Sequence, residues 1–365
     1  MAKVLGMTYT LNTSNPWIYC NYPENVKEEY LGDKGYFINR QSVSAGTGQI
    51  FYEHAIPTLT TDLYHGIRIY NGNDSNVTFK VLNYGHANRT SKNKNLESAD
   101  SWYKFFKEVN AATYTIPAKK SIWICEEKIP AKTGLFTGNL RFNTSASVVI
   151  ATYIYKNKNS IPDKTTYVPY ATTAGESNYK VYSGLGAGYF FTAKQQTLRI
   201  SQFPSDKVIK FITHARDNTN YTINGTSGTS QHEYIPLKLV SNKNLIAQYK
   251  GDTENDPLHN LGNWCAQYYF PITFNNDTNQ DVVIKCRISC KSSATGGYAM
   301  PIINCEGTIL RNALYITSTP PYWEWKTITI PANTSKNLNY QFILGANSTT
   351  NMEHQFILQN WLFFA

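Results

Sequence analysis

Charged residues are scarce in this sequence. They make up 16% of the 365 residues, and Thr, Asn, Ser and Tyr fill many of the positions that charged groups usually take on a protein surface. The net charge of +9 comes mainly from lysines that are scattered singly. A nucleic-acid-binding protein concentrates Lys and Arg on one stripe or face. The pattern therefore excludes nucleic acid as the expected partner and indicates lysines that protect strand edges.

Long hydrophobic runs are also missing. No window holds the about 18 apolar residues that a membrane-spanning helix needs, so we expect no transmembrane segment. The N-terminal stretch has no apolar core of a signal peptide. The expected protein is therefore kept inside a cell, released by lysis, or expressed in its mature form with a start codon. A cell or spore surface is the favoured location, and assembly inside a cell before release is compatible with it.

Reaction-centre motifs are absent as well. The sequence has no G-x-S-x-G elbow, no H-E-x-x-H helix and no Walker loop. Two acid–histidine neighbours, Glu53–His54 and His232–Glu233, point to opposite faces if they lie on strands. The glycine-rich stretch at 183–191 is not followed by a helix-forming segment that would bind phosphate. We therefore expect no enzymatic activity and no cofactor.

The chain has six cysteines, and three of them lie between Lys285 and Cys305. Cys286 and Cys290 cannot pair within one strand, because residues four apart are about 13 Å apart and a disulfide needs Cα atoms within about 7 Å. The spacing matches no zinc motif, and no histidine lies nearby. Buried free thiols are the leading interpretation, and cross-links within or between chains are the alternative. The possible cross-link cysteines are Cys20, Cys125, Cys265, Cys286, Cys290 and Cys305.

Aromatic residues are abundant, with 27 Tyr and 17 Phe. Aromatic and β-branched residues between frequent turn signals favour strands over helices. The length suits two domains. We predict an all-β protein with two related antiparallel β-sandwich, jelly-roll-like domains at residues 1–172 and 178–365.

An internal repeat supports two related halves. The segment 66–81 resembles 271–286, since each reads as strand, Asn/Asp turn, strand. Further on, 112–124 resembles 326–338 around a shared Thr-Ile-Pro-Ala. The repeat predicts two sandwiches built on one plan.

One short amphipathic helix is predicted near 97–109, with Trp102, Phe105, Phe106 and Val109 on one face. We expect this helix to close an open end of the first sandwich. The last segment, 354–365, is apolar on both faces and must be covered on both. It lies centrally in its own sandwich or, as the alternative, completes a sheet in a neighbouring molecule.

Three segments carry candidate binding features. Tyr322, Trp323 and Trp325 form a carbohydrate-binding strip if their rings are exposed, and core packing is the favoured alternative. Asp252, Glu254 and Asp256 are a weak Ca²⁺ candidate in an acidic loop that lacks the glycine and terminal glutamate of an EF-hand. No other metal site is expected. The segment 141–155 is the one candidate for a toxin-like hairpin that inserts into a membrane.

Two stretches carry a family resemblance: 295–309, with its Gly-Gly-Tyr-Ala, and 47–87, with Phe-Tyr-Glu-His and Asn-Tyr-Gly-His-Ala. They are similar to the C-terminal β-rich region of secreted Bacillus- and Paenibacillus-type proteins that are catalogued as copper amine oxidase N-terminal-domain proteins. The resemblance implies a surface module without catalysis. It implies no copper chemistry, because that label belongs to a different domain.

The sequence therefore predicts a non-catalytic, structural, self-associating protein of a Gram-positive cell or spore surface, or of a protein inclusion. A homo-oligomer or polymer is the expected assembly. The first alternative is a carbohydrate-binding or adhesion module that binds cell-wall or other glycans. The second alternative is a toxin-like protein that inserts into membranes.

Overall fold

The structure, a computed structural model, describes residues 2–21, 26, 36–55, 60–90, 96–107, 110–132, 134–157, 183–186, 188–213, 220–223, 226–229, 237–238, 264–291, 298–315, 322–346, 348 and 351–359. The chain divides into two compact units. The N-terminal unit comprises Thr13–Tyr189 and Ile235–Asn260, and the C-terminal unit comprises Met1–Asn12, Phe190–Tyr234 and Leu261–Ala365. Strands dominate both units, so the all-β prediction is confirmed.

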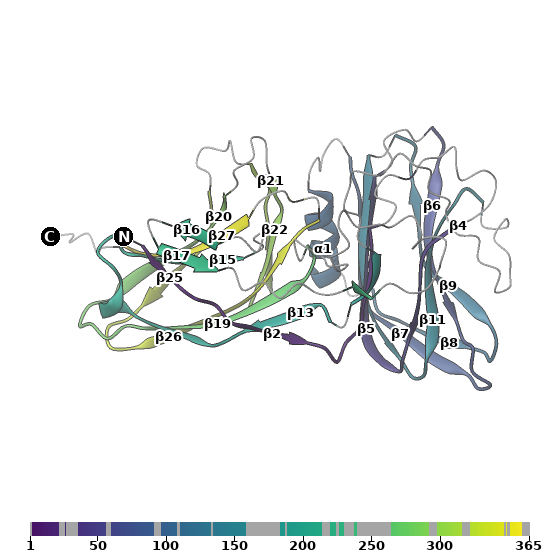
Figure 1. Ribbon diagram of the computed structural model, residues 1–365, viewed down its shortest axis with the longest axis horizontal. Coiled ribbons are helices and arrows are strands. Elements are labelled where there is room, and N and C mark those ends of the chain that lie inside the picture. Colours follow the sequence, from purple (N-terminus) through teal and green to yellow (C-terminus); the bar gives the residue numbers. More distant parts are fainter. Residues whose placement is uncertain are drawn as a thin grey trace. The chain divides into compact units, whose positions relative to one another are not determined.

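The N-terminal unit is built on eight antiparallel strands in two sheets (Figure 1). One sheet has the order β4-β11-β6-β9, and the other contains the run β5-β10-β7-β8. Counted in chain order, these are strands first-eighth-third-sixth and second-seventh-fourth-fifth, which is a jelly roll. The bounds are β4 (Tyr36–Val43), β5 (Gly46–Ala55), β6 (Leu63–Tyr70), β7 (Val77–Asn88), β8 (Ala112–Ile116), β9 (Ser121–Ile129), β10 (Leu135–Thr144) and β11 (Val148–Tyr155).

The C-terminal unit repeats this order. Its sheets contain the runs β15-β27-β20-β25 and β19-β26-β22-β23, again first-eighth-third-sixth and second-seventh-fourth-fifth. Both units are therefore jelly rolls, as the sequence predicts. The bounds are β15 (Val208–Thr213), β19 (Gln267–Asn275), β20 (Val282–Lys291), β22 (Pro301–Cys305), β23 (Thr308–Arg311), β25 (Tyr322–Ile330), β26 (Ser335–Leu344) and β27 (Asn351–Gln359).

Additional strands extend the sheets of both units, and the two units share one such addition. In each unit one strand lies parallel to the second jelly-roll strand: β3 beside β5, and β13 beside β19. The remaining elements are β1 (Lys3–Val4), β2 (Tyr9–Asn12), β3 (Trp17–Cys20), α1 (Glu97–Lys107), β12 (Ser183–Gly186), β13 (Phe190–Ala193), β14 (Gln196–Arg199), a 3₁₀ turn (Ile200–Gln202), β16 (Asn220–Ile223), β17 (Thr226–Thr229), β18 (Leu237–Lys238), β21 (Tyr298–Ala299) and β24 (Leu314–Tyr315).

The domain division departs from the predicted one at its N-terminal end. The first residues do not belong to the first sandwich, because β1 pairs with β15 and β2 pairs with β13, both in the C-terminal unit. The chain passes between the units at residues 12/13, 189/190, 234/235 and 260/261, so Ile235–Asn260 also departs from the predicted division. The predicted boundary, between residues 172 and 178, lies outside the described residues.

Period-two alternation builds the core of the N-terminal unit. On β6 and β7, Ile67, Ile69, Val77 and Phe79 are fully buried between the two sheets. Burying each such side chain contributes about 1.5–3 kcal/mol. The residues between them point away from the core, and their chemistry therefore defines the outer faces.

The helix α1 does not close an open end of the sandwich, so that prediction is wrong. It packs on β7 and β10 at the face away from the core. Ser101 of the helix donates to the Gly85 carbonyl, and Asn139 of β10 donates to the Ser101 hydroxyl at 2.8 Å. The buried aromatic face of Trp102 and Phe105 drives this packing, and Gly85 permits the close approach.

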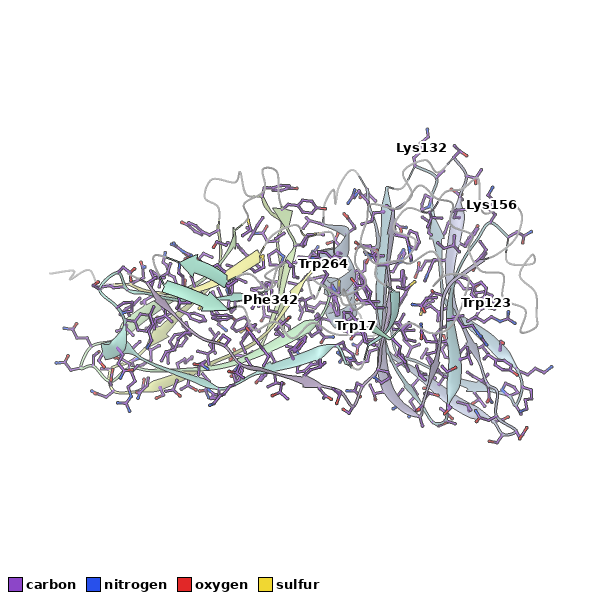
Figure 2. All side chains as sticks on the ribbon, in the orientation of Figure 1. Trp17, Trp123, Lys132, Lys156, Trp264 and Phe342 are labelled. Atoms are coloured by element: carbon purple, nitrogen blue, oxygen red, sulfur yellow. The ribbon has the colours of Figure 1, made fainter. Side chains whose placement is uncertain are left out.

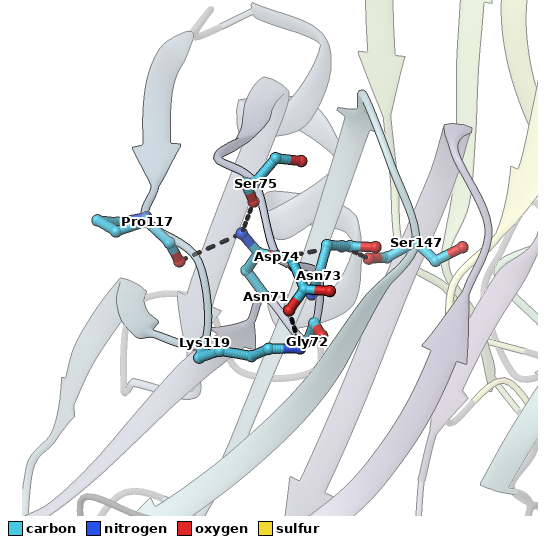
Figure 3. Close-up of polar contacts among 8 residues, drawn as sticks. All are labelled: Asn71, Gly72, Asn73, Asp74, Ser75, Pro117, Lys119 and Ser147. Atoms are coloured by element: carbon cyan, nitrogen blue, oxygen red, sulfur yellow. Dashed lines mark hydrogen bonds and ion pairs between the residues drawn. The ribbon is translucent and has the colours of Figure 1, made fainter.

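A corner joins β6–β7 to β8–β9 (Figure 3). Its centre is Asn71, which is fully buried between the two turns. The first copy of the predicted repeat contains this corner. The two copies nevertheless form different strands of their jelly rolls. The segment 66–81 forms the third and fourth jelly-roll strands, whereas 271–286 forms the second and third.

The C-terminal strand β27 lies inside its own sheet. It pairs with β15 on one side and β20 on the other, over registers that include Phe211–His354 and Ile288–His354. The described part of this strand therefore does not complete a neighbour's sheet, and the central placement is confirmed. Residues 360–365 lie outside the described residues.

Candidate functional site

The predicted carbohydrate strip does not form one platform. Trp325 is 8% exposed and packs on Tyr340 with ring centroids 5.0 Å apart, so its face belongs to the core. Tyr322 lies on the other side of β25, where the Arg287 guanidinium carbon stands 4.1 Å from its ring centroid. Trp323 is half-buried.

None of the six cysteines, all of which are described, forms a disulfide. Five are buried, and Cys125 is half-buried. The Cys20 sulfur lies 3.6 Å from His54 Nε2 and 3.5 Å from Thr152 Oγ1. Burial raises the pKa of the Cys286 thiol well above its usual range. A cross-link between chains would first have to bring one of these sulfurs to the surface.

The acidic-loop candidate and one acid–histidine pair lie outside the described residues. The acidic loop of Asp252, Glu254 and Asp256 is outside them, as are His232 and Glu233. Within the described residues, no group of three or more His, Cys, Asp or Glu side chains is arranged to hold a metal ion.

The membrane-related candidates are placed as follows. The described helix is not long and apolar enough to cross a membrane. In the hairpin candidate at 141–155, Phe142, Val148, Ile150 and Ile154 pack in the core of the N-terminal unit. That segment is therefore a structural part of the sandwich.

An aromatic cluster that sequence reasoning missed lies on the outer face of the sheet β4-β11-β6-β9. We call it the Trp123 cluster, and Figure 2 labels its central ring. Tyr64 comes from β6, Trp123 from β9, and Tyr153 and Tyr155 from β11. Because inward residues on these strands alternate with outward ones, all four rings gather on the side away from the core.

The rings of the Trp123 cluster hold one another in place. Trp123 meets Tyr153 and Tyr155 edge to face, with ring centroids 5.1 and 5.6 Å apart. Tyr64 stacks on Tyr155 at 5.7 Å. A Cβ on Gly66 would lie 3.1 Å from the indole, so glycine on the neighbouring strand makes room for the ring. Each aromatic pair of this kind is worth about 0.5–1.5 kcal/mol beyond its buried area.

Charged groups flank the same rings. The Arg68 guanidinium carbon is 5.7 Å from the Trp123 ring centroid. The Tyr155 hydroxyl donates to Glu126 Oε1 at 2.8 Å, and burial together with this carboxylate raises the pKa of Tyr155. Trp123 is half-buried and Glu126 is exposed, whereas Arg68, Tyr153 and Tyr155 are buried. The cluster therefore presents one apolar ring and one positioned carboxylate to solvent. Such a combination can stack on a sugar ring and hydrogen-bond its hydroxyl groups.

A second polar group lies inside the N-terminal unit. The Tyr52 hydroxyl hydrogen-bonds with the Tyr84 hydroxyl at 3.0 Å and with His86 Nδ1 at 3.1 Å. The imidazole of His65 stacks on Tyr52 with ring centroids 3.9 Å apart. Glu127 completes the group through a hydrogen bond with Tyr84.

Burial favours the neutral forms of the histidines in this internal group. Burial lowers the pKa of His65 well below its usual value, and His54 and His86 add to the effect. Burial and Lys104 lower the pKa of His86 to about 4. Burial raises the pKa of Glu127. Both imidazoles are therefore neutral at pH 7 and contribute stacking and hydrogen bonds to the core.

No family model matches the chain, and no curated protein matches it. Several solved structures resemble it at low scores. The PBSX exported protein XepA is 7% identical, with 90% of this chain and 88% of that chain covered and a TM-score of 0.17. The Cry4Aa toxin of Bacillus thuringiensis is 10% identical, with 98% and 59% covered and a TM-score of 0.22. The STIV MCP is 11% identical, with 89% and 95% covered and a TM-score of 0.17. Likeness at these scores carries no argument about fold or function.

Proposed function

We propose that this chain is a non-catalytic structural protein of a cell or spore surface, or of a protein inclusion, that associates with copies of itself. The observation that supports self-association best is the edge strand β25. Within the described residues it pairs with β20 on one side only. Unpaired backbone donors and acceptors along such an edge are a template for another strand.

The charges on β25 lie near its start, so its uncharged end is the part that we propose to pair with a second copy. Glu324 and Lys326 lie near its start, with Glu324 in ion pairs with Lys285 and Arg287 at 3.2 Å each. The remaining residues, 327–330, are Thr-Ile-Thr-Ile and carry no charge. Thr327 and Thr329 are exposed on the outer face. A second copy can therefore add a strand here without burying a charge.

Self-association is tested by size-exclusion chromatography with light scattering over a range of protein concentrations, together with negative-stain electron microscopy with and without reductant. The mass of the wild-type chain should grow with concentration. A T327K/T329K double variant should shift the transition to higher concentration, because edge lysines block strand addition. Thr192→Lys is the matched control, since Thr192 is exposed on β13 with paired strands on both sides. A wild-type chain that stays monomeric throughout would overturn the proposal.

A second candidate function is glycan binding, which the Trp123 cluster favours. Here the half-buried Trp123 ring anchors a sugar, and the exposed Glu126 carboxylate orients its hydroxyl groups. Titration of tryptophan fluorescence with cell-wall glycan fragments tests it. Trp123→Ala should abolish the signal change, whereas Trp323→Ala should keep it. Equal binding by both variants would exclude the Trp123 cluster as the site.

A further inference from the structure

The turn between β22 and β23 fixes the position of Cys305. Cys305 ends β22, pairs with Thr308, and is followed by the two-residue turn Glu306-Gly307. Both turn residues have positive φ, 52° at Glu306 and 80° at Gly307, as a tight hairpin requires. The cysteine is 3% exposed and lies directly beside this surface turn.

Lys326 reaches Cys305 from the opposite sheet of the C-terminal unit. Its Nζ donates to the Cys305 sulfur at 3.1 Å and to Glu306 Oε2 at 3.3 Å. The β25 ladder carries a bulge at this point, because Lys326 pairs with Cys286 and Glu324 pairs with the next residue of β20. The Lys326 side chain is 28% exposed and that of Glu306 is 63% exposed, so solvent reaches the amine.

This contact distinguishes Cys305 from the neighbouring thiols. Cys286 is fully buried, and burial raises its pKa. Burial likewise raises the pKa of Cys290 and of Cys125. Thiols in apolar surroundings are inert, whereas sulfurs beside a lysine or arginine are the reactive class.

We propose that Cys305 and Lys326 are a modification site at which a peroxide joins the two side chains through a sulfur–nitrogen bond. Hydrogen peroxide transfers one oxygen to the thiolate sulfur, which becomes a sulfenic acid. The hydroxide that is released takes a proton from the Lys326 ammonium and leaves as water. The neutral amine then attacks the sulfur, the sulfur–nitrogen bond forms, and the sulfur–oxygen bond breaks.

The hydroxyl group leaves with a proton of the amine as a second water. In sum, one thiolate, one ammonium and one peroxide give one sulfenamide and two waters, so the peroxide is the two-electron oxidant and sulfur is oxidised. Sulfenic acids condense with a thiol or a nitrogen in this way, and thiols reverse the reaction. The bond would join the two sheets of the C-terminal unit, since β22 and β25 belong to different sheets.

The experiment treats the full chain with hydrogen peroxide and measures its intact mass and its tryptic peptides. Cross-linking lowers the mass by about 2 Da, whereas a sulfenic acid raises it by about 16 Da. Trypsin does not cleave at a modified lysine. We therefore expect peptide 292–311 joined to peptide 312–336, with cleavage at Lys326 lost and thiol treatment restoring it.

Three variants separate this site from other cysteine chemistry. Lys326→Arg keeps the charge but removes the nucleophilic amine, so the sulfenic acid should persist and be trapped by dimedone. Lys285→Arg, on the neighbouring strand, should retain the cross-link, as should Cys286→Ser. A Lys326→Arg chain that still loses about 2 Da at Cys305 would assign the bond to a disulfide and overturn the proposal. An unmodified Cys305 in the wild-type chain would overturn it as well.

Discussion

Asn71 and Asn276 form the same set of hydrogen bonds at two different places in the chain. The side-chain amide of Asn71 donates to the carbonyl oxygens of Ser75, Ile116 and Pro117 at 2.8, 3.0 and 3.2 Å. One asparagine thus joins the turn after β6 to the turn after β8.

Asn276 does the same in the C-terminal unit. Its amide donates to the carbonyl oxygens of Gln280, Ile330 and Pro331 at 2.8, 3.0 and 3.0 Å. Here it joins the turn after β19 to the turn after β25. The two corners are chemically equal, although they occupy different strand positions of their jelly rolls.

Replacing either asparagine should destabilise its unit strongly. Asn71→Ala and Asn276→Ala each leave buried carbonyl oxygens without a donor, which should lower the free energy of unfolding by about 2–4 kcal/mol. Urea denaturation measures the change. Asn337→Ala is the control, because Asn337 is exposed and its contact with Thr273 is at the surface; it should cost less than about 0.5 kcal/mol. Equal midpoints for the three variants would contradict the corner's role.

The repeat in the sequence points to these corners because a corner needs particular residues close together. Asparagine followed by a polar turn, and Ile-Pro-Ala after a strand, are local patterns. Which strands lie beside one another is a matter of long-range pairing. The one-strand offset between the two corners therefore appears only when the sheet order is known.

The Trp123 cluster was unpredictable for the same reason. Trp123 and Tyr155 come from β9 and β11, which are separated in the sheet by β6, and Gly66 of β6 leaves the space between them. No segment of the sequence contains all three residues. The strip of Trp323 and Trp325 could be identified from the sequence because both residues lie in one strand. The alternative of core packing agrees with the burial of Trp325.

Gly85 should not tolerate a side chain. A Cβ there would overlap the Ser101 carbonyl oxygen and the Phe105 amide nitrogen, both of which are backbone atoms of α1 that cannot rotate away. Gly85→Ala should therefore push the helix off the sheet and cost about 3 kcal/mol. The denaturation midpoint and the near-ultraviolet signal of the tryptophans measure this.

Gly6→Ala is the matched control, because a Cβ at Gly6 meets nothing within 4 Å. It should change the free energy of unfolding by less than about 0.5 kcal/mol. If Gly85→Ala changed the free energy of unfolding as little as Gly6→Ala, α1 could not lie as close to β7 as described.

The ion pair of Arg89 and Glu97 should respond asymmetrically to substitution. The Glu97 side chain is fully buried at the start of α1, and its Oε1 accepts from Arg89 Nε at 3.1 Å and from Arg89 Nη2. Arg89→Met leaves a buried carboxylate without its partner and should cost about 3–5 kcal/mol. Glu97→Gln keeps a hydrogen-bond acceptor and buries no charge, so it should cost less. Thermal unfolding of both variants gives the order, and the reverse order would argue against a buried ion pair.

His354 should make the C-terminal unit sensitive to acid. Its Nδ1 hydrogen-bonds with the Tyr340 hydroxyl at 3.0 Å and its Nε2 with the Thr213 hydroxyl at 3.1 Å. The ring stacks on Phe211 with centroids 4.5 Å apart. Burial lowers the pKa of His354 to about 3 in the folded state.

The unfolded chain therefore binds a proton at this histidine at a higher pH than the folded chain does. The stability is fully present above the unfolded pKa near 6.5 and is lost as the pH falls toward 3, at up to about 1.4 kcal/mol per pH unit. Urea denaturation between pH 7 and pH 4 measures the slope. His354→Gln should be less stable than the wild-type chain at pH 7 and should lose stability less steeply toward pH 4. Parallel curves for the two chains would mean that His354 takes up its proton while folded. In that case its pKa would not be lowered, and the ring would have to be accessible to water.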